Sequence, residues 1–487
     1  MRGPRVLRPK ASLALLTGLL LAVSLTACGG SDESARAGEP RPLVTSPPLK
    51  PGFTWKQKDY VLRCEGESVT VDVENPKGWS ASVGDSRLRG GSFTVIWAAK
   101  VNRSLPVIFR KAGKPPRSFH IRCLPKDFPP YRFERYRPGG PRLIMVELER
   151  YAVAFDRGGV PVWWYYATGN VNNARFMGDG TFTYAPVNGI YSREFMVHRL
   201  DGKLVRKLQA AGNVVTDVHD LIRLPNGNYM LGAHRYIRGV DTSRFGGPAS
   251  ARLDTAQVQE ITPGGRLVWK WNAWPRVKLA ETGRWWEQVI DMGQPFDIHH
   301  WNSVDRRGNL VLLSFRHLDA VLEINRSTGA IRWKLGGTRT ARSLKVLKDP
   351  RAGYPLGGQH DARYKRDSTI TLLDNATGLK VQRPRALRYR ISPANSSATM
   401  LKQVTDPEVD FSLGFASANL FPSGQWLVGW GAIGRDGIIG GYTSDGKPAF
   451  RLTTPYRVSY RANPVTTRSP TIPQLRRAMD SMHRRES

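Results

Sequence analysis

Cysteine is scarce in this chain, with three residues in 487. No two of them form a CxxC pair, which argues against a cysteine-based zinc site. A Gly-rich phosphate loop of the P-loop type is also missing, and no long segment of helical period interrupts the short apolar runs. These absences argue against a P-loop nucleotide enzyme and against an α/β fold.

An apolar run near the N-terminus, Ala11–Leu25, is too short to span a bilayer stably. Basic residues precede it, as in a secretory signal peptide. The residues that follow, Leu25-Thr26-Ala27-Cys28-Gly29-Gly30, resemble the lipobox of bacterial lipoproteins. This resemblance implies cleavage after residue 27, a lipid on Cys28, and anchoring at the extracytoplasmic face of the cell membrane. An ordinary secretory signal with a coincidental cysteine is the alternative.

Two cysteines remain once Cys28 is set apart, namely Cys64 and Cys123. An even pair in an oxidising compartment is expected to form a disulfide. Two buried free thiols are the alternative.

Acidic residues are few relative to basic ones: 40 Asp and Glu stand against 73 Lys and Arg, a formal net charge of +33. Because the basic residues are spread along the whole sequence, and because an exported protein rarely meets nucleic acid, we expect no nucleic-acid partner. The charge indicates attraction to anionic envelope polymers or anionic small substrates. A generally basic proteome explains it equally well.

The sequence divides into five regions: residues 1–27, 28–50, 51–128, 129–462 and 463–487. Residues 1–27 are the expected signal peptide, and residues 28–50, rich in Ser, Gly, Pro and charge, predict a flexible tether. Residues 51–128 contain short runs of period-two patterning, which predict a small β-sandwich in which Cys64 and Cys123 tie an early strand to a late one. Residues 463–487 form a tail, expected as a short helix or without order.

Residues 129–462 contain a repeat of roughly 43 to 68 residues. Each cycle has a turn followed by a hydrophobic strand, as in Arg307–Leu313, and then a second hairpin that often closes on Trp, as in Gly264–Trp269. Four short strands per cycle is the size of a propeller blade, and five or six cycles plus closure give about six blades. The predicted fold is therefore all-β: a six-bladed β-propeller preceded by an N-terminal β-sandwich.

Three histidines stand at the same point of their repeats, just before the strand that precedes the turn. They are His219, His300 and His360. Equivalent points of successive blades converge on the central channel, so histidines in phase predict one shared site. For any one of them taken singly, a structural or surface histidine is the alternative.

Five motifs resemble those of the arylsulfotransferase family, bacterial enzymes that move a sulfuryl group between phenols without a nucleotide donor. They are Asp297-x-x-His300-x-Asn302-Ser303, Leu313-Ser314-Phe315-Arg316, Trp333-x-Leu335-Gly336-Gly337, Gln359-His360-Asp361-Ala362 and Asp374-Asn375. The resemblance covers about residues 140–460 and is most specific over residues 297–375. Members of the family pair a β-sandwich with a six-bladed propeller, in agreement with the patterning.

The resemblance implies a role for each matching residue. His360 corresponds to the histidine that is transiently sulfated, and Arg316 to the arginine that holds the sulfate. His219 and His300 correspond to the two other channel histidines, and Asn302 to a polar position beside the site. The implied reaction takes a small aromatic sulfate ester and a phenol acceptor, and it needs neither cofactor nor metal.

Residue chemistry agrees with these roles. A sulfate ester is a monoanion with dispersed charge, which a guanidinium can bind through two N–H groups. An imidazole with a pKa near 6.5 is mostly neutral at pH 7 and can act as the nucleophile, and a second imidazole can carry the proton of the phenol. His299 leaves the assignment of the third histidine open by one residue, although His300 fits the motif register and His299 would point to the other face of a strand.

Three other readings compete. A binding propeller without catalysis would form no covalent intermediate. A quinoprotein-type oxidoreductase is suggested by Asn325–Trp333, which resembles a tryptophan-docking repeat, but only this one cycle matches. Zinc could bind three histidines, but Arg316 in the same site would oppose a cation. The motifs do not specify donor, acceptor or oligomeric state.

Overall fold

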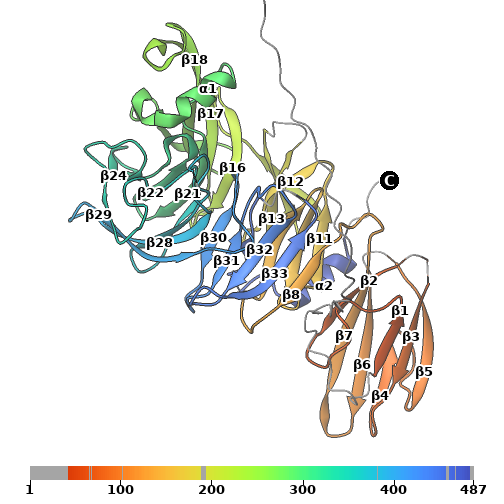
Figure 1. The fold of residues 1–487 in the computed structure, drawn as a ribbon. Coiled ribbons are helices and arrows are strands. Elements are labelled where there is room, and N and C mark those ends of the chain that lie inside the picture. Colours follow the sequence, from red (N-terminus) through yellow and green to blue (C-terminus); the bar gives the residue numbers. More distant parts are fainter. Residues whose placement is uncertain are drawn as a thin grey trace, which may run out of the picture. The chain divides into compact units, whose positions relative to one another are not determined.

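The computed structural model describes residues 42–482 apart from 65, 67, 101, 102, 188–192, 381, 457–459 and 467. Strands predominate throughout this part, so the predicted all-β class is confirmed (Figure 1). The expected signal peptide, Cys28 and most of the tether lie outside the described residues, and the lipid anchor stays a prediction. Within the described part, no helix has the length and apolar character needed to cross a bilayer.

The N-terminal region forms two sheets, with strand orders β1-β3-β5 and β2-β7-β6-β4. The strands are β1 (Leu43–Ser46), β2 (Asp59–Arg63), β3 (Ser68–Glu74), β4 (Ser80–Val83), β5 (Ser92–Ala98), β6 (Ser104–Lys111) and β7 (Lys114–Leu124). Alternate residues of β3, namely Val69, Val71 and Val73, are buried, as period-two patterning requires. They share one apolar core with Val107 of β6 and Phe119 of β7, so the two sheets pack face to face as expected for a β-sandwich.

The ordered fold begins before residue 51. Strand β1 lies within the range expected to be a tether, and it pairs antiparallel with β3. Leu43 and Thr45 point inward and are buried, which is enough to fix a four-residue strand. The surrounding proline- and charge-rich composition hides this short alternation in the sequence.

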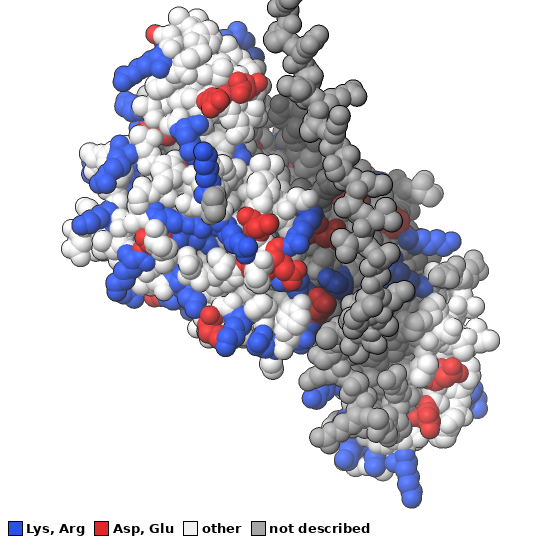
Figure 2. All heavy atoms as spheres, viewed as in Figure 1, with Lys and Arg blue, Asp and Glu red and all other residues white. Residues whose placement is uncertain are grey.

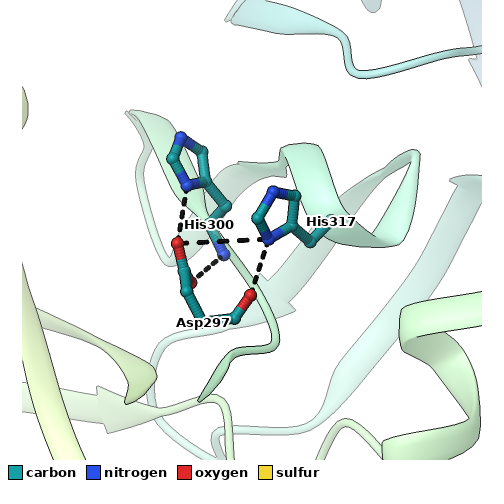
Figure 3. A group of neighbouring side chains, drawn as sticks. All are labelled: Asp297, His300 and His317. Carbon is teal, nitrogen blue, oxygen red and sulfur yellow. Dashed lines mark hydrogen bonds and ion pairs between the residues drawn. The ribbon is translucent and has the colours of Figure 1, made fainter. Parts of the chain in front are cut away.

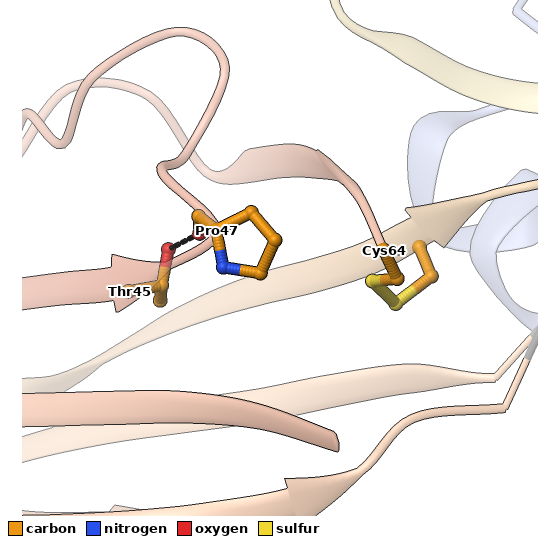
Figure 4. The surroundings of a disulfide bond; sticks show 4 residues. Thr45, Pro47 and Cys64 are labelled. Carbon is orange, nitrogen blue, oxygen red and sulfur yellow. Dashed lines mark hydrogen bonds between the residues drawn. A yellow bond between two sulfur atoms is a disulfide. The ribbon is translucent and has the colours of Figure 1, made fainter. Parts of the chain in front are cut away.

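The predicted disulfide between Cys64 and Cys123 is present, with Cα atoms 5.6 Å apart (Figure 4). Strands β2 and β7 are parallel neighbours in which Leu62 lies opposite Cys123. Cys64 follows the end of β2 and therefore stands beside its partner. The bond ties an early strand to the last strand of the region, as the spacing indicated.

Six further sheets follow from residue 132 onward. Their orders are β11-β10-β9-β34, β12-β13-β14-β15, β16-β17-β18-β19, β21-β22-β23-β24, β25-β29-β28-β27-β26 and β30-β31-β32-β33-β8, with β20 added to β18. Their strands are β8 (Arg132–Arg135), β9 (Leu143–Leu148), β10 (Tyr151–Asp156), β11 (Pro161–Tyr166), β12 (Asn170–Phe176), β13 (Thr181–Val187), β14 (Phe195–Arg199), β15 (Leu204–Leu208), β16 (Val215–Arg223), β17 (Tyr229–Val240), β18 (Ala251–Ile261), β19 (Leu267–Asn272), β20 (Phe296–Asp297), β21 (Trp301–Arg307), β22 (Leu310–Phe315), β23 (Ala320–Asn325), β24 (Ile331–Gly336), β25 (Lys345–Leu347), β26 (His360–Tyr364), β27 (Thr369–Asp374), β28 (Arg385–Ser392), β29 (Ser397–Val404), β30 (Ser417–Leu420), β31 (Trp426–Gly429), β32 (Gly437–Tyr442), β33 (Pro448–Thr454) and β34 (Asn463–Pro464). Two α-helices, α1 (Trp286–Asp291) and α2 (Ile472–Asp480), and three short 3-10 helices, η1 (Ser243–Phe245), η2 (Leu279–Trp285) and η3 (Arg316–Leu318), complete the described elements.

The first strands of these sheets contact one another in turn. Strand β9 contacts β12, β12 contacts β16, β16 contacts β21, β21 contacts β26, β26 contacts β30, and β30 contacts β34. Strand β34, from the end of the region, pairs with β9, and β8, from its beginning, pairs with β33. This succession of antiparallel sheets, tied together by both ends of the region, is β-propeller-like.

The turns that open the repeat are built on glycine. Gly180, Gly227, Gly308 and Gly424 have φ angles of 83°, 86°, 58° and 81°, in the left-handed region that glycine enters without strain. Each precedes the second strand of its sheet, so the turn-and-strand half of the predicted repeat is confirmed. Apolar side chains of neighbouring sheets then pack together, as Leu335 of β24 does with Leu372 of β27.

The expected tail contributes to the fold. Strand β34 lies within residues 463–487, and helix α2 follows with Thr471 as its N-cap. Leu475 and Met479 of α2 are buried in the same core as β10 and β11. On the surface, Lys and Arg are scattered over the face in view with Asp and Glu among them (Figure 2).

Candidate active site

His219 and His300 lie side by side, with ring centroids 4.9 Å apart. His219 is on β16, the first strand of its sheet. His300 directly precedes β21, the first strand of the next sheet, and β21 contacts β16. Each imidazole is fixed through Nδ1 by a carboxylate: Asp217 Oδ1 at 2.5 Å and Asp297 Oδ2 at 2.6 Å (Figure 3). The Nε2 atoms are therefore the nitrogens left to meet a substrate.

The two carboxylates are held in their charged form. Burial disfavours ionisation of Asp297, but His300 and neighbouring imidazoles outweigh it and keep the pKa of Asp297 well below its usual range. The same balance, with His219 and His234 as the opposing groups, lowers the pKa of Asp217. Burial lowers the pKa of His300, against the opposing pull of the Asp297 carboxylate.

His360 is the first residue of β26 and is buried. Its Nδ1 lies 2.8 Å from the Gly358 carbonyl and 2.8 Å from Asn375 Oδ1. The Asn375 amide nitrogen donates to Ser412 Oγ, which turns the amide oxygen toward His360. Because both neighbours of Nδ1 are acceptors, Nδ1 carries the proton and Nε2 holds a lone pair. Burial, followed by the charge of Arg316, keeps the pKa of His360 well below its ordinary value.

A strained segment borders this Nε2. Phe415 and Ala416 have φ angles of 64° and 96°, which non-glycine residues rarely adopt. The turn aims the Phe415 N–H at His360 Nε2, 3.2 Å away, and Ala416 is held by a backbone hydrogen bond to Tyr460. A Cβ atom on Gly414 would lie 3.8 Å from both Arg316 Nε and His360 Cε1, so both side chains border Gly414.

Arg316 begins η3, at the end of β22, and is largely buried. Its Nη1 donates to His317 Nε2 at 2.8 Å, its Nη2 donates to the Leu413 carbonyl at 3.3 Å, and the guanidinium lies 4.3 Å from the ring of Trp285. Burial lowers the pKa of Arg316 to about 10, which leaves the side chain charged at neutral pH. The structure thus brings together His219, His300, Arg316 and His360.

Asn302, predicted beside the site, is fully buried behind it. Its amide nitrogen donates to the Gln359 carbonyl at 2.8 Å, one residue before His360. His299 points away from His219: its Nδ1 accepts from the Ala256 N–H at 3.3 Å and its ring contacts Phe315. The residue beside His219 is therefore His300, in agreement with the motif register, while the role of each histidine stays a prediction.

Several residues of the site are not singled out by sequence reasoning. His317 holds Arg316, and His234 of β17 lies 2.9 Å from Asp254 Oδ2 through Nδ1 and 3.7 Å from Asp217 Oδ2 through Nε2. His317 directly follows the motif that ends at Arg316, so the sequence could have indicated that it belongs to the site. Nothing in the sequence marks His234, because its partners become neighbours only when β16, β17 and β18 pair.

Asp297, His300 and His317 also lie close enough to form a three-ligand metal group (Figure 3). Their facing atoms are nevertheless committed to hydrogen bonds: His300 Nδ1 to the Asp297 carboxylate and His317 Nδ1 to the Asp297 carbonyl, both at 2.6 Å. Such separations fit a shared proton better than two atoms of one coordination sphere. The Arg316 guanidinium, bonded to His317, would also repel a cation.

Other motif residues position the catalytic candidates. Gln359 Nε2 donates to Ser314 Oγ, to the Phe315 carbonyl and to the Ala320 carbonyl, which fixes the residue before His360 to the β22–β23 turn. Gly336 and Gly337 lie against the Asp319 and Leu318 carbonyls, where a Cβ atom would approach within 2.4 and 2.1 Å. The Gly-Gly pair of the motif therefore allows β24 to pack under η3.

Comparisons with known proteins identify the family. A sequence model of the Arylsulfotransferase (ASST) family matches residues 135–456. No curated protein matches the chain. Among solved structures, a protein of unknown function from Bacteroides caccae is 11% identical, with 67% of this chain and 100% of that chain covered and a TM-score of 0.42. The periplasmic gluconolactonase PpgL of Pseudomonas aeruginosa is 14% identical, with 63% and 82% covered and a TM-score of 0.36.

These solved structures are too dissimilar to this chain for its fold or its activity to be inferred from them. The family match, in contrast, spans about two thirds of the sequence, includes all five motifs, and supports a sulfotransferase activity. The chain belongs to the arylsulfotransferase family.

Proposed function

We propose that this protein transfers a sulfuryl group from a phenolic sulfate ester to a phenolic acceptor through a sulfo-histidine on His360, without a nucleotide donor. The observation that carries the proposal is the tautomer of His360. Its Nδ1–H is held by two acceptors, and its ring and Arg316 both lie beside Gly414. A buried, neutral imidazole whose Nε2 lone pair accepts only from the Phe415 N–H, near an anion-binding guanidinium, suits nucleophilic attack on a sulfate ester once that long hydrogen bond opens.

In the first half-reaction, His360 Nε2 attacks sulfur. A bond forms from Nε2 to sulfur as the bond from sulfur to the aryl oxygen breaks, and the phenolate leaves with the electron pair. Arg316 binds the sulfuryl oxygens, whose charge is dispersed over the group. His219 or His300, as an imidazolium stabilised by its carboxylate, gives the phenolate a proton from Nε2.

The second half-reaction reverses the first with another phenol. The imidazole that gave its proton now takes one from the acceptor hydroxyl, and the acceptor oxygen attacks sulfur. The bond from Nε2 to sulfur breaks, and His360 recovers its lone pair. The cycle is therefore ping-pong, with one phenol leaving before the next one reacts.

The same proposal includes the architecture and the location. The six sheets from β8 to β34 are six blades of a propeller around the channel that holds the histidines. The chain is exported and anchored by a lipid on Cys28, which the lipobox-like sequence and the disulfide between Cys64 and Cys123 support. Labelling with a radioactive fatty acid, lost in Cys28→Ser, tests the anchor.

The function is tested with a coloured aryl sulfate, with and without a phenol acceptor. We expect colour release stimulated by the acceptor, and a sulfuryl mass increment on the peptide that contains His360. His360→Gln should lower kcat/KM by at least about 1000-fold and abolish the increment. His198→Gln is the matched control, because His198 is also buried and bonded through Nδ1 to a backbone carbonyl but belongs to β14.

A binding propeller without catalysis is the competing function. Absence of turnover across a broad panel of sulfate esters, together with absence of any mass increment on His360, would favour it over the transferase.

A further inference from the structure

Both ring nitrogens of His317 are in hydrogen bonds, although the proposed function gives this residue no role. It is buried at the second position of η3. Its Nδ1 lies 2.6 Å from the Asp297 carbonyl, and its Nε2 lies 2.8 Å from Arg316 Nη1. A carbonyl only accepts, so Nδ1 carries the proton, and the Nε2 lone pair is left to accept from the guanidinium.

The surroundings of the ring keep this arrangement in place. The His317 ring centroid lies 4.9 Å from that of Trp285 and 4.6 Å from that of His300. Burial, followed by the positive character of His300, lowers the pKa of His317 to about 3, so the ring stays neutral at any pH at which the enzyme would work. A protonated ring would lose the lone pair and would repel Arg316.

On the basis of the proposed function, we propose that His317 is a positioning residue that orients the Arg316 guanidinium toward the sulfuryl group. A guanidinium has five N–H groups. Nη1 donates to His317 and Nη2 to the Leu413 carbonyl, which fixes the plane of the fork and leaves its other N–H groups for an anion. The Nε atom lies beside Gly414, which also borders the His360 ring.

Asp297 connects this orientation to the proton-transfer side of the site. Its carboxylate holds His300, and its carbonyl holds His317 (Figure 3). One residue therefore sets both the imidazole that would move the phenol proton and, through His317, the arginine that would bind the sulfuryl group. Partners of this kind, behind a functional group, typically change affinity or activity by 10- to 100-fold when removed.

Two amide substitutions separate the roles of the two ring nitrogens. His317→Gln can place an oxygen near the Nε2 position and accept from Arg316. His317→Asn can place an N–H near the Nδ1 position and donate to Asp297, but it is too short to reach Arg316. The two variants have similar polarity and both replace a buried ring, so a difference between them does not come from lost packing alone.

The experiment uses the full chain purified from its membrane, as wild type, His317→Gln and His317→Asn. Inorganic sulfate is the anion probe, titrated by calorimetry, and an aryl sulfate is the substrate. We expect His317→Asn to bind sulfate at least about 10-fold more weakly than His317→Gln and to have a donor KM raised by a similar factor, with the acceptor KM unchanged. His317→Gln should remain within a few-fold of wild type.

Equal sulfate affinity and equal donor KM in the two variants would overturn the positioning role while leaving the transferase function intact. A wild type that binds sulfate but neither turns over aryl sulfates nor sulfates His360 would instead overturn the function. In that case the difference in sulfate affinity between the two variants still decides the positioning role.

Discussion

At the scale of single residues, neighbours in one motif have separate tasks. Gln359 points into the core and anchors the chain, and His360 presents its Nε2 to the site. Asp361, at a φ of 59°, turns away and accepts from the Ala418 N–H of the next sheet. Strand alternation and one left-handed residue are enough to separate anchoring, chemistry and packing within three positions.

Gly414 offers a steric test of the space between His360 and Arg316. Its φ lies outside the left-handed region and its added Cβ would meet no atom closer than 3.8 Å, so Gly414→Ala should fold normally. The methyl group would nevertheless occupy the space assigned to the sulfuryl group. We expect kcat/KM for the donor to fall by about 100-fold, since misplacement of this size removes reactive geometry.

Thermal unfolding and donor kinetics of the Gly414→Ala variant check this expectation. Gly353→Ala is the matched control, because a Cβ there meets no atom within 4 Å and Gly353 lies elsewhere. Unchanged donor kinetics in Gly414→Ala, with a normal midpoint of unfolding, would show that the sulfuryl group binds in another place.

At the scale of elements, the site depends on a short strand and a short helix that no sequence periodicity predicts. Strand β20 has two residues and pairs parallel with β18, and η3 has three residues. Together they bring Asp297 to His300 and His317. The sequence predicted the strands that carry His219 and His360 and the strand that follows His300, because their turns and apolar runs repeat. It did not predict these connections, because loops are shaped by the contacts they find in the folded chain.

His234 gives the β16–β17–β18 sheet a stability that depends on pH. Burial disfavours the charged ring, but Asp217 and Asp254 outweigh it and raise the pKa of His234 to about 10. A histidine in an unfolded chain has a pKa near 6.5. The contribution of His234 is therefore fully present at pH 6.5 and is lost as the pH rises from 6.5 through 10.

Denaturant unfolding at a series of pH values measures this contribution. Wild type should lose on the order of 2 kcal/mol between pH 6.5 and 10, less than the full pKa difference implies because about a quarter of the His234 side chain is exposed. His234→Gln should be less stable at pH 6.5 and should lack this slope. Parallel pH profiles for the two proteins would contradict the assignment.

At the scale of the whole molecule, the all-β class, the repeat and the disulfide follow from local signals: alternation, glycine turns and two cysteines. The beginning and end of the fold do not. Strands β1 and β34 are short, and each gains its stability from a partner far along the chain, β3 and β9 respectively. Pairing of this kind depends on where the rest of the chain brings the ends, which a local pattern does not contain.

The closing segment of the chain is fixed by a buried charge cluster. Arg461, two residues before β34, donates to Asp220 Oδ1 of β16 at 2.6 Å and to the Asn302 carbonyl of β21 at 2.7 Å. Asp220 is fully buried and also pairs with Arg175 and Arg363. Burial opposes its ionisation, but the three arginines, Arg363 foremost, hold the pKa of Asp220 far below its usual range.

Removal of Arg461 should therefore destabilise the whole region rather than one sheet. Arg461→Met keeps the volume but takes one cation from a buried carboxylate and leaves the Asn302 carbonyl without that donor. We therefore expect a loss of about 3 kcal/mol in the free energy of unfolding.

Arg332→Met is the control. Arg332 also pairs with a buried carboxylate, that of Glu323, but its side chain is 38% exposed, so a loss below about 1 kcal/mol is expected. Denaturant unfolding followed by tryptophan fluorescence measures both. A loss in Arg461→Met no larger than that of the control would mean that strand pairing by β34 and β8, and not the buried charges, holds the ends of the propeller-like region together.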